Sequence, residues 1–352
     1  MTRLVVHIGL PKSGSSAVQA FAADNGDRLR EHGFGWLPGR RGPNLTELAV
    51  AFCDRDNPIS RRYGVDHDHD RRKLQLRLRR RLTEAVDQHR QLIISSEHLS
   101  ALLRSAAEVA ELADYLHSIS DQVLIIGVVR RGDHWLPSDW VEAVRSGRTI
   151  RLGRRFVERR AHLLDHQSLV SRWTTAFGAD GVRLIPYLED DKSDPVALPE
   201  RLLAAAGVPR SADDWRRPAQ LTRSGLSATA VEVLRQLNPQ LGLADWHSGA
   251  DRQRLITLLD QRHPGPGPGL TRPALAGLEE HGWIRTGIEQ TEASFGDHWS
   301  DWVQAPMASI QAAAEPEPAV VQDTLAALRA AGFGSRNPIR TRAERLLQRV
   351  RR

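Results

Sequence analysis

The sequence predicts an α/β protein in which a parallel β-sheet lies between two layers of helices, with additional helices toward the C-terminus. Four short apolar runs have the length and the β-branched content of buried strands. Longer stretches with helical periodicity separate them, and this alternation favours parallel pairing in a three-layer fold. We expect the strands at residues 5–8, 91–96, 123–129 and 182–187, and the main helices at residues 71–86, 106–117, 156–177, 195–206, 222–237 and 320–331.

Composition limits the class of protein. A chain of 352 residues, 40% hydrophobic and 26% charged, can bury one sizeable core, or a core and a smaller helical lobe. Its formal net charge of +6 suits an acidic ligand. The arginines are spread along the chain, however, and aromatic residues make up only 5%, so a nucleic-acid-binding module is not indicated.

Two features bear on cellular location. Cys53 is the only cysteine, which excludes an intrachain disulfide and a thiolate zinc site and fits a reducing cytoplasm. The first predicted strand begins close to Met1, which leaves no room for a signal peptide, and no run of about 18 apolar residues follows. We therefore expect a cytoplasmic protein without a membrane span.

The stretch after the first predicted strand is a glycine-containing loop that leads into a helix. Ser15 and Ser16 can cap this helix, which ends near Asn25. Backbone N–H groups and the positive end of the helix dipole then face one concavity, where Lys12 adds a point charge. Such a concavity suits a phosphate or a sulfonate. The loop consists of Pro11, Lys12, Ser13, Gly14, Ser15 and Ser16.

This loop differs from the G-x-x-x-x-G-K-[ST] loop of nucleoside triphosphate-binding proteins, because Lys12 precedes Gly14. It resembles the 5′-phosphosulfate-binding loop of sulfotransferases that use 3′-phosphoadenosine 5′-phosphosulfate (PAPS), whose usual form is Pro-Lys-Ser/Thr-Gly-Thr/Ser-Thr/Ser. Residues 7–10 (HIGL) are similar to the variant found in bacterial sulfotransferases. The resemblance implies that Lys12 lies beside the bridging oxygen of the phosphosulfate. The alternative is a generic strand-to-helix turn.

A second resemblance follows the third predicted strand. Arg130 stands at the strand end, and Ser138, which we expect to open a helix, comes eight positions later. The two resemble the 3′-phosphate-binding pair of PAPS sulfotransferases, and a guanidinium with a nearby hydroxyl suits a phosphate. Together the two motifs imply the P-loop-like sulfotransferase fold, with PAPS as co-substrate, adenosine 3′,5′-bisphosphate (PAP) as product and no metal requirement. The resemblance covers residues 4–147 well and the remainder loosely.

The general base is expected at the end of the second predicted strand, because ligands bind beyond the carboxyl ends of parallel strands. Glu97 fits the Ser-Ser-Glu segment of bacterial members of the family, where the glutamate acts as base. His98 fits the histidine-leucine pair of the cytosolic animal enzymes. We favour Glu97. For either residue the alternative is an exposed loop position or, for the carboxylate, a helix cap.

The predicted function is therefore transfer of a sulfonate group from PAPS to a hydroxyl, or as a second choice an amine, of a carbohydrate, lipid or natural-product acceptor. One alternative is a P-loop-type kinase or nucleotide hydrolase, which would need a magnesium-binding Ser or Thr directly after Gly-Lys. Another is a non-catalytic nucleotide-binding protein. A homodimer is allowed by the sequence but not indicated.

Three segments are expected along the chain. Residues 1–240 form the PAPS-binding core, in which the irregular segment 29–90 is a candidate lining of the acceptor cleft. Residues 241–312 form a helical and loop extension, with Trp283, Trp299 and Trp302, that packs on the core or covers the acceptor. Residues 313–352 form a linker, a helix and a basic tail. Asp66, His67, Asp68, His69 and Asp70 alternate in a way that would not bring their side chains together, so we expect no metal site there.

Overall fold

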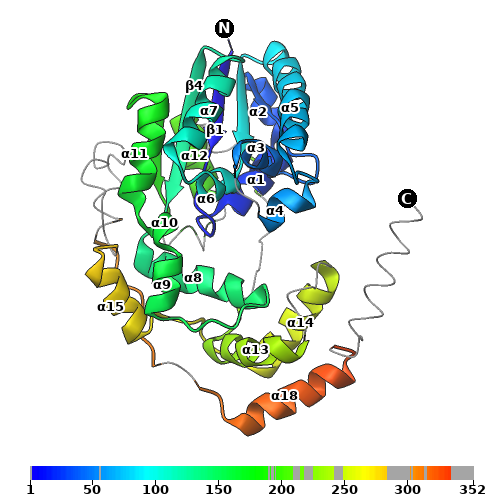
Figure 1. Ribbon diagram of the computed structural model, residues 1–352, viewed down its shortest axis with the longest axis vertical. Coiled ribbons are helices and arrows are strands. Elements are labelled where there is room, and N and C mark those ends of the chain that lie inside the picture. The colour runs from blue at the N-terminus through cyan, green and yellow to red at the C-terminus, as the bar shows by residue number, and fades with distance from the viewer. Residues whose placement is uncertain are drawn as a thin grey trace. The chain divides into compact units, whose positions relative to one another are not determined.

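The computed structural model divides the chain into two compact units (Figure 1). The first contains Met1–Trp135, Glu158–Leu221 and Leu278–Met307, and the second contains Leu136–Val157, Thr222–Gly277 and Ala308–Arg352. The grouping follows contacts rather than chain order, and the three-segment division expected from the sequence stays a prediction. The structure describes residues 2–54, 57–188, 191, 194, 196–208, 215–217, 225–241, 249–283, 302, 304–312 and 315–333.

The first unit is built on a parallel sheet with the strand order β2-β3-β1-β4-β5, five strands among the described residues. All its neighbouring strands pair in parallel, so the predicted fold class is confirmed. The four predicted strands are present, and β2 is an additional edge strand. The strands are β1 (Arg3–His7), β2 (Phe34–Trp36), β3 (Gln91–Ser95), β4 (Gln122–Val129) and β5 (Val182–Pro186).

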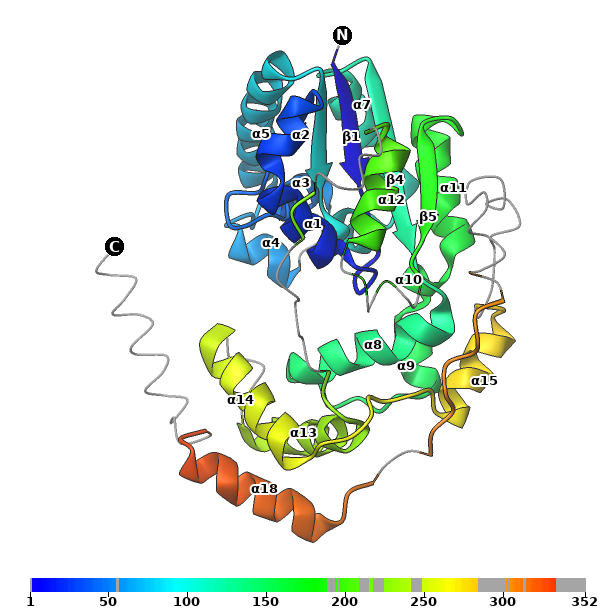
Figure 2. The ribbon, with the colours of Figure 1, turned by 180° about the vertical axis from the view of Figure 1, so that it is seen from behind.

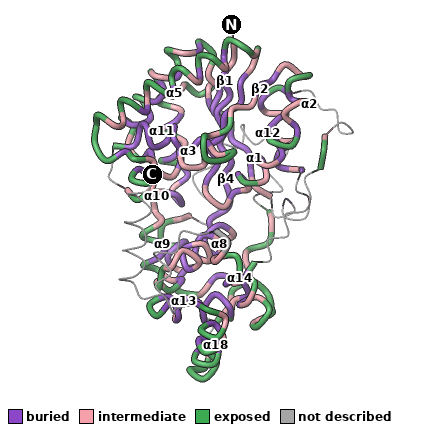
Figure 3. The backbone as a smooth tube through the Cα atoms, turned by 90° about the vertical axis from the view of Figure 1, so that its right-hand side faces the viewer, coloured by how far each residue is buried: buried purple, intermediate pink, exposed green. Residues whose placement is uncertain are grey.

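Two layers of helices cover the sheet, which is why its strands are apolar throughout rather than alternating. The helices α1 (Ser15–Asp24), α2 (Gly26–Glu31) and α12 (Ala197–Ala206) lie on one face (Figure 2). The other face carries α3 (Thr46–Phe52), α5 (Asp68–Gln88), α7 (Ala106–His117) and α11 (His166–Phe177) (Figure 1). Figure 3 shows the central strands as buried.

Shorter helices complete the first unit. They are α4 (Pro58–Arg62), α6 (Glu97–Leu102) and α10 (Ala161–Leu164). The helices α8 (Gly132–Arg145) and α9 (Arg154–Arg159) pass from one unit to the other along the chain. Among the described helices, none combines the length and the apolar character that crossing a membrane requires.

The regular secondary-structure elements that the structure describes in the second unit are helices. Its helices are α13 (Ala228–Leu241), α14 (Gly249–Arg262), α15 (Arg272–Glu280) and α18 (Pro318–Ala330). Inside it, Asn238 of α13 donates to the carbonyl oxygens of Val144 (2.9 Å) and Arg148 (2.8 Å). Arg235 pairs with Glu232 and donates to Thr149 O (3.0 Å). These contacts satisfy polar groups that are buried in the unit.

Three local predictions were wrong. The first part of the segment 29–90, which was expected to be irregular, contains part of α2, all of β2 and all of α3. The helix predicted at 156–177 is divided into α9, α10 and α11, because the Asp165 carboxylate accepts from Ser168 N (3.0 Å) and starts a new helix. Ser138 does not open a helix, because α8 already begins at Gly132 and takes Pro137 into its interior.

Candidate functional site

The predicted anion-binding loop lies at the carboxyl edge of the sheet, between the central strand β1 and helix α1 (Figure 2). From β1 the chain passes to α1 on one face of the sheet, whereas from the neighbouring strand β3 it passes through α6 to α7 on the other face. Chain connections that diverge in this way open a crevice, and α/β proteins bind ligands there.

The loop has an unusual backbone. Lys12 has a φ of 65° and Gly14 a φ of 81°, both in the left-handed region. Gly14 is also the N-cap of α1, and no side chain caps that helix. The expectation that Ser15 and Ser16 cap the helix was therefore wrong, because both lie inside its first turn. Because no side chain caps the helix, backbone N–H groups of its first turn can donate hydrogen bonds to a ligand.

Three side chains hold the loop carbonyl groups. Trp135 Nε1 donates to Pro11 O (2.6 Å), Arg130 Nη1 donates to Lys12 O (3.2 Å) and Ser100 Oγ donates to Gly9 O (3.0 Å). The donors come from α8, from the residue after β4 and from α6. These hydrogen bonds occupy the carbonyl oxygens of the turn. The groups that remain to bind a ligand are therefore mainly its N–H donors.

The loop itself carries two buried hydroxyl groups, those of Ser13 and Ser15. The side chains of Ser13 (0% exposed) and Ser15 (2% exposed) are buried, and neither Oγ has a hydrogen-bond partner among the described residues. Buried polar atoms are normally paired, so such atoms beside a helix N-terminus fit an anionic group that accepts hydrogen bonds. The residues present therefore fit the 5′-phosphosulfate end of PAPS.

The loop also leaves no room for a side chain at its second glycine. A Cβ atom on Gly14 would lie 2.3 Å from Leu198 Cδ2 and 3.0 Å from Tyr187 Cε2. Leu198 belongs to α12, which lies on the same face of the sheet as α1, and Tyr187 follows β5, so these two side chains pack tightly against the turn. Glycine is required here both by the space and by the positive φ.

Arg130 and Lys12 lie together, since Arg130 Nη1 donates to Lys12 O. The Arg130 side chain is 4% exposed, and its Cζ lies 4.8 Å from the centre of the Tyr187 ring, a cation–π distance. Ser138 belongs to α8 at a position assigned to the second unit. The pairing of Arg130 with Ser138 around a 3′-phosphate stays a prediction.

Glu97 is the first residue of α6 and is partly buried. The Ser100 hydroxyl bridges this turn to the loop, because its Oγ lies 3.0 Å both from Glu97 O and from Gly9 O. The first turn of α6 is thereby attached to the anion-binding loop. A carboxylate at this position can accept a proton from a group bound beside the loop.

The Nδ1 atom of His98 has two hydrogen-bond partners. Asn44 Nδ2 lies 3.3 Å and Thr46 Oγ1 3.2 Å from His98 Nδ1, and burial lowers the pKa of the ring. An amide nitrogen carries only donor hydrogens, so Nδ1 accepts and the neutral ring keeps its proton on Nε2. A ring in this state can donate a hydrogen bond through Nε2 but is not ready to accept a proton there.

The sequence analysis missed several residues that support the loop. Trp135 and Ser100 anchor it as described, Tyr187 packs against it, and His7 lies beneath it beside Ser95. The parallel register pairs His7 with Ser95 across β1 and β3. Each residue is the next to last of a predicted strand, so their positions were the available signal, but only the strand order makes them neighbours.

The segment around Trp302 is fastened to the first unit. The buried guanidinium of Arg131 pairs with Asp133 (2.6 Å) and donates to the carbonyl oxygens of Trp302 (3.3 Å) and Ala305 (2.5 Å). Trp302 is itself 2% exposed. Trp299 and the basic tail at 340–352 lie outside the described residues.

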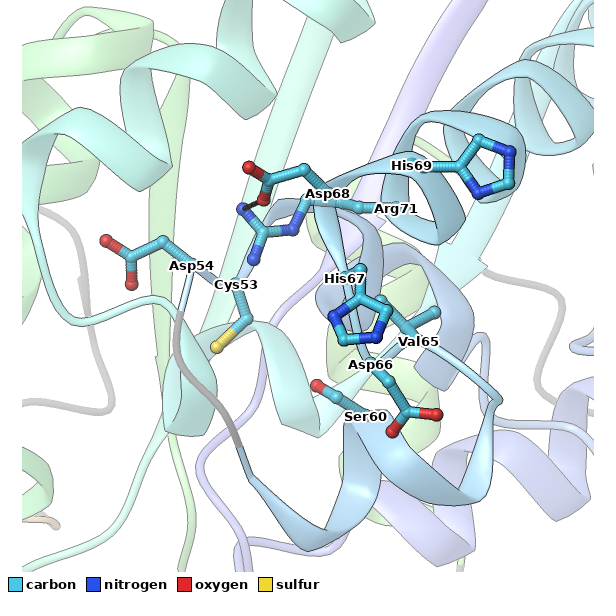
Figure 4. A pocket seen from close by; sticks show the side chains of 9 residues that line it. All are labelled: Cys53, Asp54, Ser60, Val65, Asp66, His67, Asp68, His69 and Arg71. Atoms are coloured by element: carbon cyan, nitrogen blue, oxygen red, sulfur yellow. Dashed lines mark ion pairs between the residues drawn. The ribbon is translucent and has the colours of Figure 1, made fainter.

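A cavity of about 500 Å³ lies apart from the loop, at the C-terminal end of α3 and the start of α5 (Figure 4). Its lining includes Cys53 and the side chains of residues 66–69. One of the lining carboxylates, Asp68, pairs with Arg71 (3.7 Å). Asp70, which does not line the cavity, accepts from His67 N (3.3 Å). In the part of the chain that the structure describes, no group of three or more His, Cys, Asp or Glu side chains could hold a metal ion.

Comparison with known proteins gives limited similarity. No protein-family model and no curated protein matches the chain. Among solved structures, it is similar to the crystal structure of a sulfotransferase from Alicyclobacillus acidocaldarius, with a TM-score of 0.41 and 14% sequence identity over 70% of this chain and 94% of that chain. Similarity at this level is too low to assign a function, which has to be inferred from the residues of this chain.

Proposed function

We propose that this protein is a PAPS-dependent sulfotransferase that transfers a sulfonate group to a hydroxyl of a carbohydrate, lipid or natural-product acceptor. The observation that carries the proposal is the loop from Pro11 to Ser16. It combines the sequence of a phosphosulfate loop with left-handed turns at Lys12 and Gly14, buried serine hydroxyls and the uncapped start of α1. All of these features favour an anion with several acceptor oxygens.

In this scheme the loop binds the 5′ end of the nucleotide. Backbone N–H groups of the first turn of α1, with the Ser13 and Ser15 hydroxyls, donate to the phosphate oxygens. Lys12 stabilises the negative charge that develops on the bridging oxygen as the sulfur–oxygen bond breaks. When bound, PAPS supplies the sulfonate, and PAP leaves with the electron pair of the bridging oxygen.

Arg130 is the proposed partner of the 3′-phosphate, together with Ser138. Its guanidinium donates to Lys12 O (3.2 Å), which brings the residue proposed to hold the 3′-phosphate next to the loop proposed to hold the 5′ end. This would connect the two ends of one nucleotide through a single side chain. The role of Ser138 rests on the sequence resemblance alone.

Glu97 is the proposed general base for the acceptor hydroxyl. The first turn of α6 is attached to the loop through Ser100, and the hydrogen bonds at His98 Nδ1 leave that ring as a donor. His98 would therefore orient the acceptor or the sulfonate, while Glu97 takes the proton.

The test is transfer from radiolabelled PAPS to a panel of hydroxylated carbohydrates, lipids and natural products, with chelator present. We expect label to appear in at least one acceptor class with release of PAP, and Lys12→Ala to remove this transfer. A protein that phosphorylates the same panel from ATP and magnesium, and releases no PAP, would support the kinase alternative. Tight PAP binding without transfer to any acceptor would support a non-catalytic binding protein.

A further inference from the structure

A buried polar network lies directly beneath the anion-binding loop. His7, the last residue of β1, is 0% exposed, and its Nδ1 lies 2.9 Å from Ser95 Oγ. Gln19 of α1 donates from Nε2 to the same Ser95 Oγ (3.1 Å). The network therefore joins the central strand, its neighbour β3 and the helix that follows the loop.

The network favours one of the two ring nitrogens of His7 as the site of its proton. The Gln19 amide nitrogen can only donate, so Ser95 Oγ accepts from it and can direct its own hydrogen to His7 Nδ1. Burial lowers the pKa of His7 to about 3, so the ring carries a single proton at neutral pH. With Nδ1 accepting, that proton is on Nε2.

The Nε2 side of the His7 ring faces the anion-binding loop. A Cβ atom on Gly9 would lie 2.7 Å from His7 Nε2 and 2.9 Å from Ser15 Oγ, so both atoms approach the same point. Neither atom has a hydrogen-bond partner among the described residues, and both side chains are at most 2% exposed. The absence of a side chain at Gly9 leaves the space through which the imidazole and the hydroxyl can approach each other.

We propose that His7 is a positioning residue for the anion-binding loop: as the 5′-phosphate binds, the His7 ring and the Ser15 side chain close the gap between them, His7 Nε2 donates its hydrogen to Ser15 Oγ, and the Ser15 hydroxyl hydrogen points to the phosphate. This inference rests on the proposed function, since it assigns a task within the same site. The hydroxyl that accepts from His7 has its own hydrogen free for the anion. A hydroxyl that is enclosed by buried side chains has few other orientations, so little freedom is lost when the ligand binds.

Two substitutions of His7 separate the contribution of Nε2 from that of Nδ1. The His7→Gln side chain can place an N–H where Nε2 is, whereas the shorter His7→Asn side chain reaches only the Ser95 side. We expect His7→Asn to weaken PAP binding about tenfold, which corresponds to about 1.4 kcal/mol, and His7→Gln to recover most of that loss. His166→Asn removes another buried histidine, on α11, and is the matched control for loss of stability alone.

A double-mutant cycle tests the link to Ser15. In a Ser15→Ala background, His7→Asn should cost little further PAP affinity, because the hydroxyl that it orients is gone. Equal weakening by His7→Asn and His7→Gln, or a full tenfold loss from His7→Asn in the Ser15→Ala protein, would overturn the inference. If the unsubstituted protein binds no PAP, the proposed function itself fails, which is a different result.

A measurement on the unsubstituted protein covers the case in which the His7 variants do not fold. Nitrogen NMR of histidine-labelled protein distinguishes a protonated from an unprotonated Nε2. We expect a buried histidine that is protonated on Nε2 and whose Nε2 signal shifts when PAP is added, and no such shift in the Ser15→Ala protein. A His7 ring protonated on Nδ1, or a PAP-induced shift that persists without the Ser15 hydroxyl, would contradict the proposal.

Discussion

At the residue scale, Lys12 combines the charge that is proposed to act in sulfonate transfer with an unfavourable backbone conformation. It has a φ of 65°, and among the described residues it is the non-glycine residue with a positive φ. The left-handed conformation costs an L-residue roughly 1–2 kcal/mol, and such strain is retained at positions where function requires a particular side chain. Trp135 and Arg130, which hold the carbonyls of Pro11 and Lys12, stabilise this turn.

Substitution of Lys12 should separate stability from activity. Lys12→Ala keeps the strain and removes the ammonium group, and Lys12→Gly removes both. We expect both variants to lose sulfonate transfer, and Lys12→Gly to be more stable than Lys12→Ala by about 1 kcal/mol in urea unfolding. Lys73→Ala, at an exposed position of α5, is the control and should change neither property. Transfer that survives in Lys12→Ala would contradict the assigned role.

The two candidate bases can be compared directly. Glu97→Gln should lower the transfer rate by roughly 10²–10⁴-fold at saturating acceptor, because the amide cannot take the proton. His98→Asn should have a smaller effect, mostly on acceptor KM, because the ring is held as a donor by Asn44 and Thr46. The reverse order of the two rate losses would assign the proton transfer to His98.

Much of the candidate site could be predicted from the sequence, because the loop is contiguous. Pro11 to Ser16 needed only the local pattern of strand, glycine turn and helix. His7 could not be recognised in the same way, because its role depends on the pairing of β1 with β3 and on a side chain from α1. Ser138 was misplaced in its helix because a proline usually starts a helix, whereas α8 contains Pro137.

At the scale of elements, the turn between β1 and α1 depends on close packing. Gly14 and Gly33 have nearly the same φ, 81° and 82°, but a Cβ atom at Gly33 would meet nothing within 4 Å, whereas one at Gly14 would meet Leu198 and Tyr187. The pair therefore separates the cost of the backbone conformation from the cost of crowding.

We expect Gly33→Ala to lower the free energy of unfolding by about 1 kcal/mol through φ alone, and Gly14→Ala to lower it by about 1–3 kcal/mol more. Only Gly14→Ala should also weaken PAP binding, because it displaces the start of α1. Urea unfolding and PAP titration of both variants provide the measurement. Equal stability losses, with PAP affinity unchanged in both, would show that the packing against α12 does not support the loop.

The strands and helices with strong patterns were predictable from the sequence. The helix predicted at 106–117 is α7 with the same limits, since the Ser105 side chain caps it by accepting from Glu108 N (3.2 Å). By contrast, β2 has three residues, one of them Gly35, and exists through its pairing with β3. Such a short edge strand has too little local pattern to be recognised before the sheet is known.

At the scale of the whole molecule, buried histidines link stability to pH. Burial lowers the pKa of His7 to about 3 and that of His166 to about 4, from an ordinary value near 6.5. Below pH ~6.5 the unfolded chain therefore binds protons that the folded chain does not, so these groups make stability rise with pH. Their contribution is fully present above pH ~6.5 and is lost as the pH falls toward the folded values.

Unfolding by urea at several pH values measures this link. Between about pH 6 and pH 5 each buried histidine should remove about 1.4 kcal/mol of unfolding free energy per pH unit. His166→Asn should lower the dependence of the unfolding free energy on pH by the contribution of one histidine, about 1.4 kcal/mol per pH unit. The substitution should also lower stability at pH 7. A slope that is unchanged in this variant would show that His166 is protonated in the folded protein.

The central claim is that the loop of the first unit binds a 3′,5′-bisphosphorylated nucleotide rather than a triphosphate. Calorimetric titration of the full-length chain with PAP in the presence of chelator, and with ATP and magnesium in parallel, tests this claim most directly. We expect PAP to bind without metal and at least tenfold more tightly than ATP, and Lys12→Ala and Arg130→Ala each to weaken PAP binding about tenfold or more. Tighter binding of ATP with magnesium, or no binding of PAP, would contradict the claim.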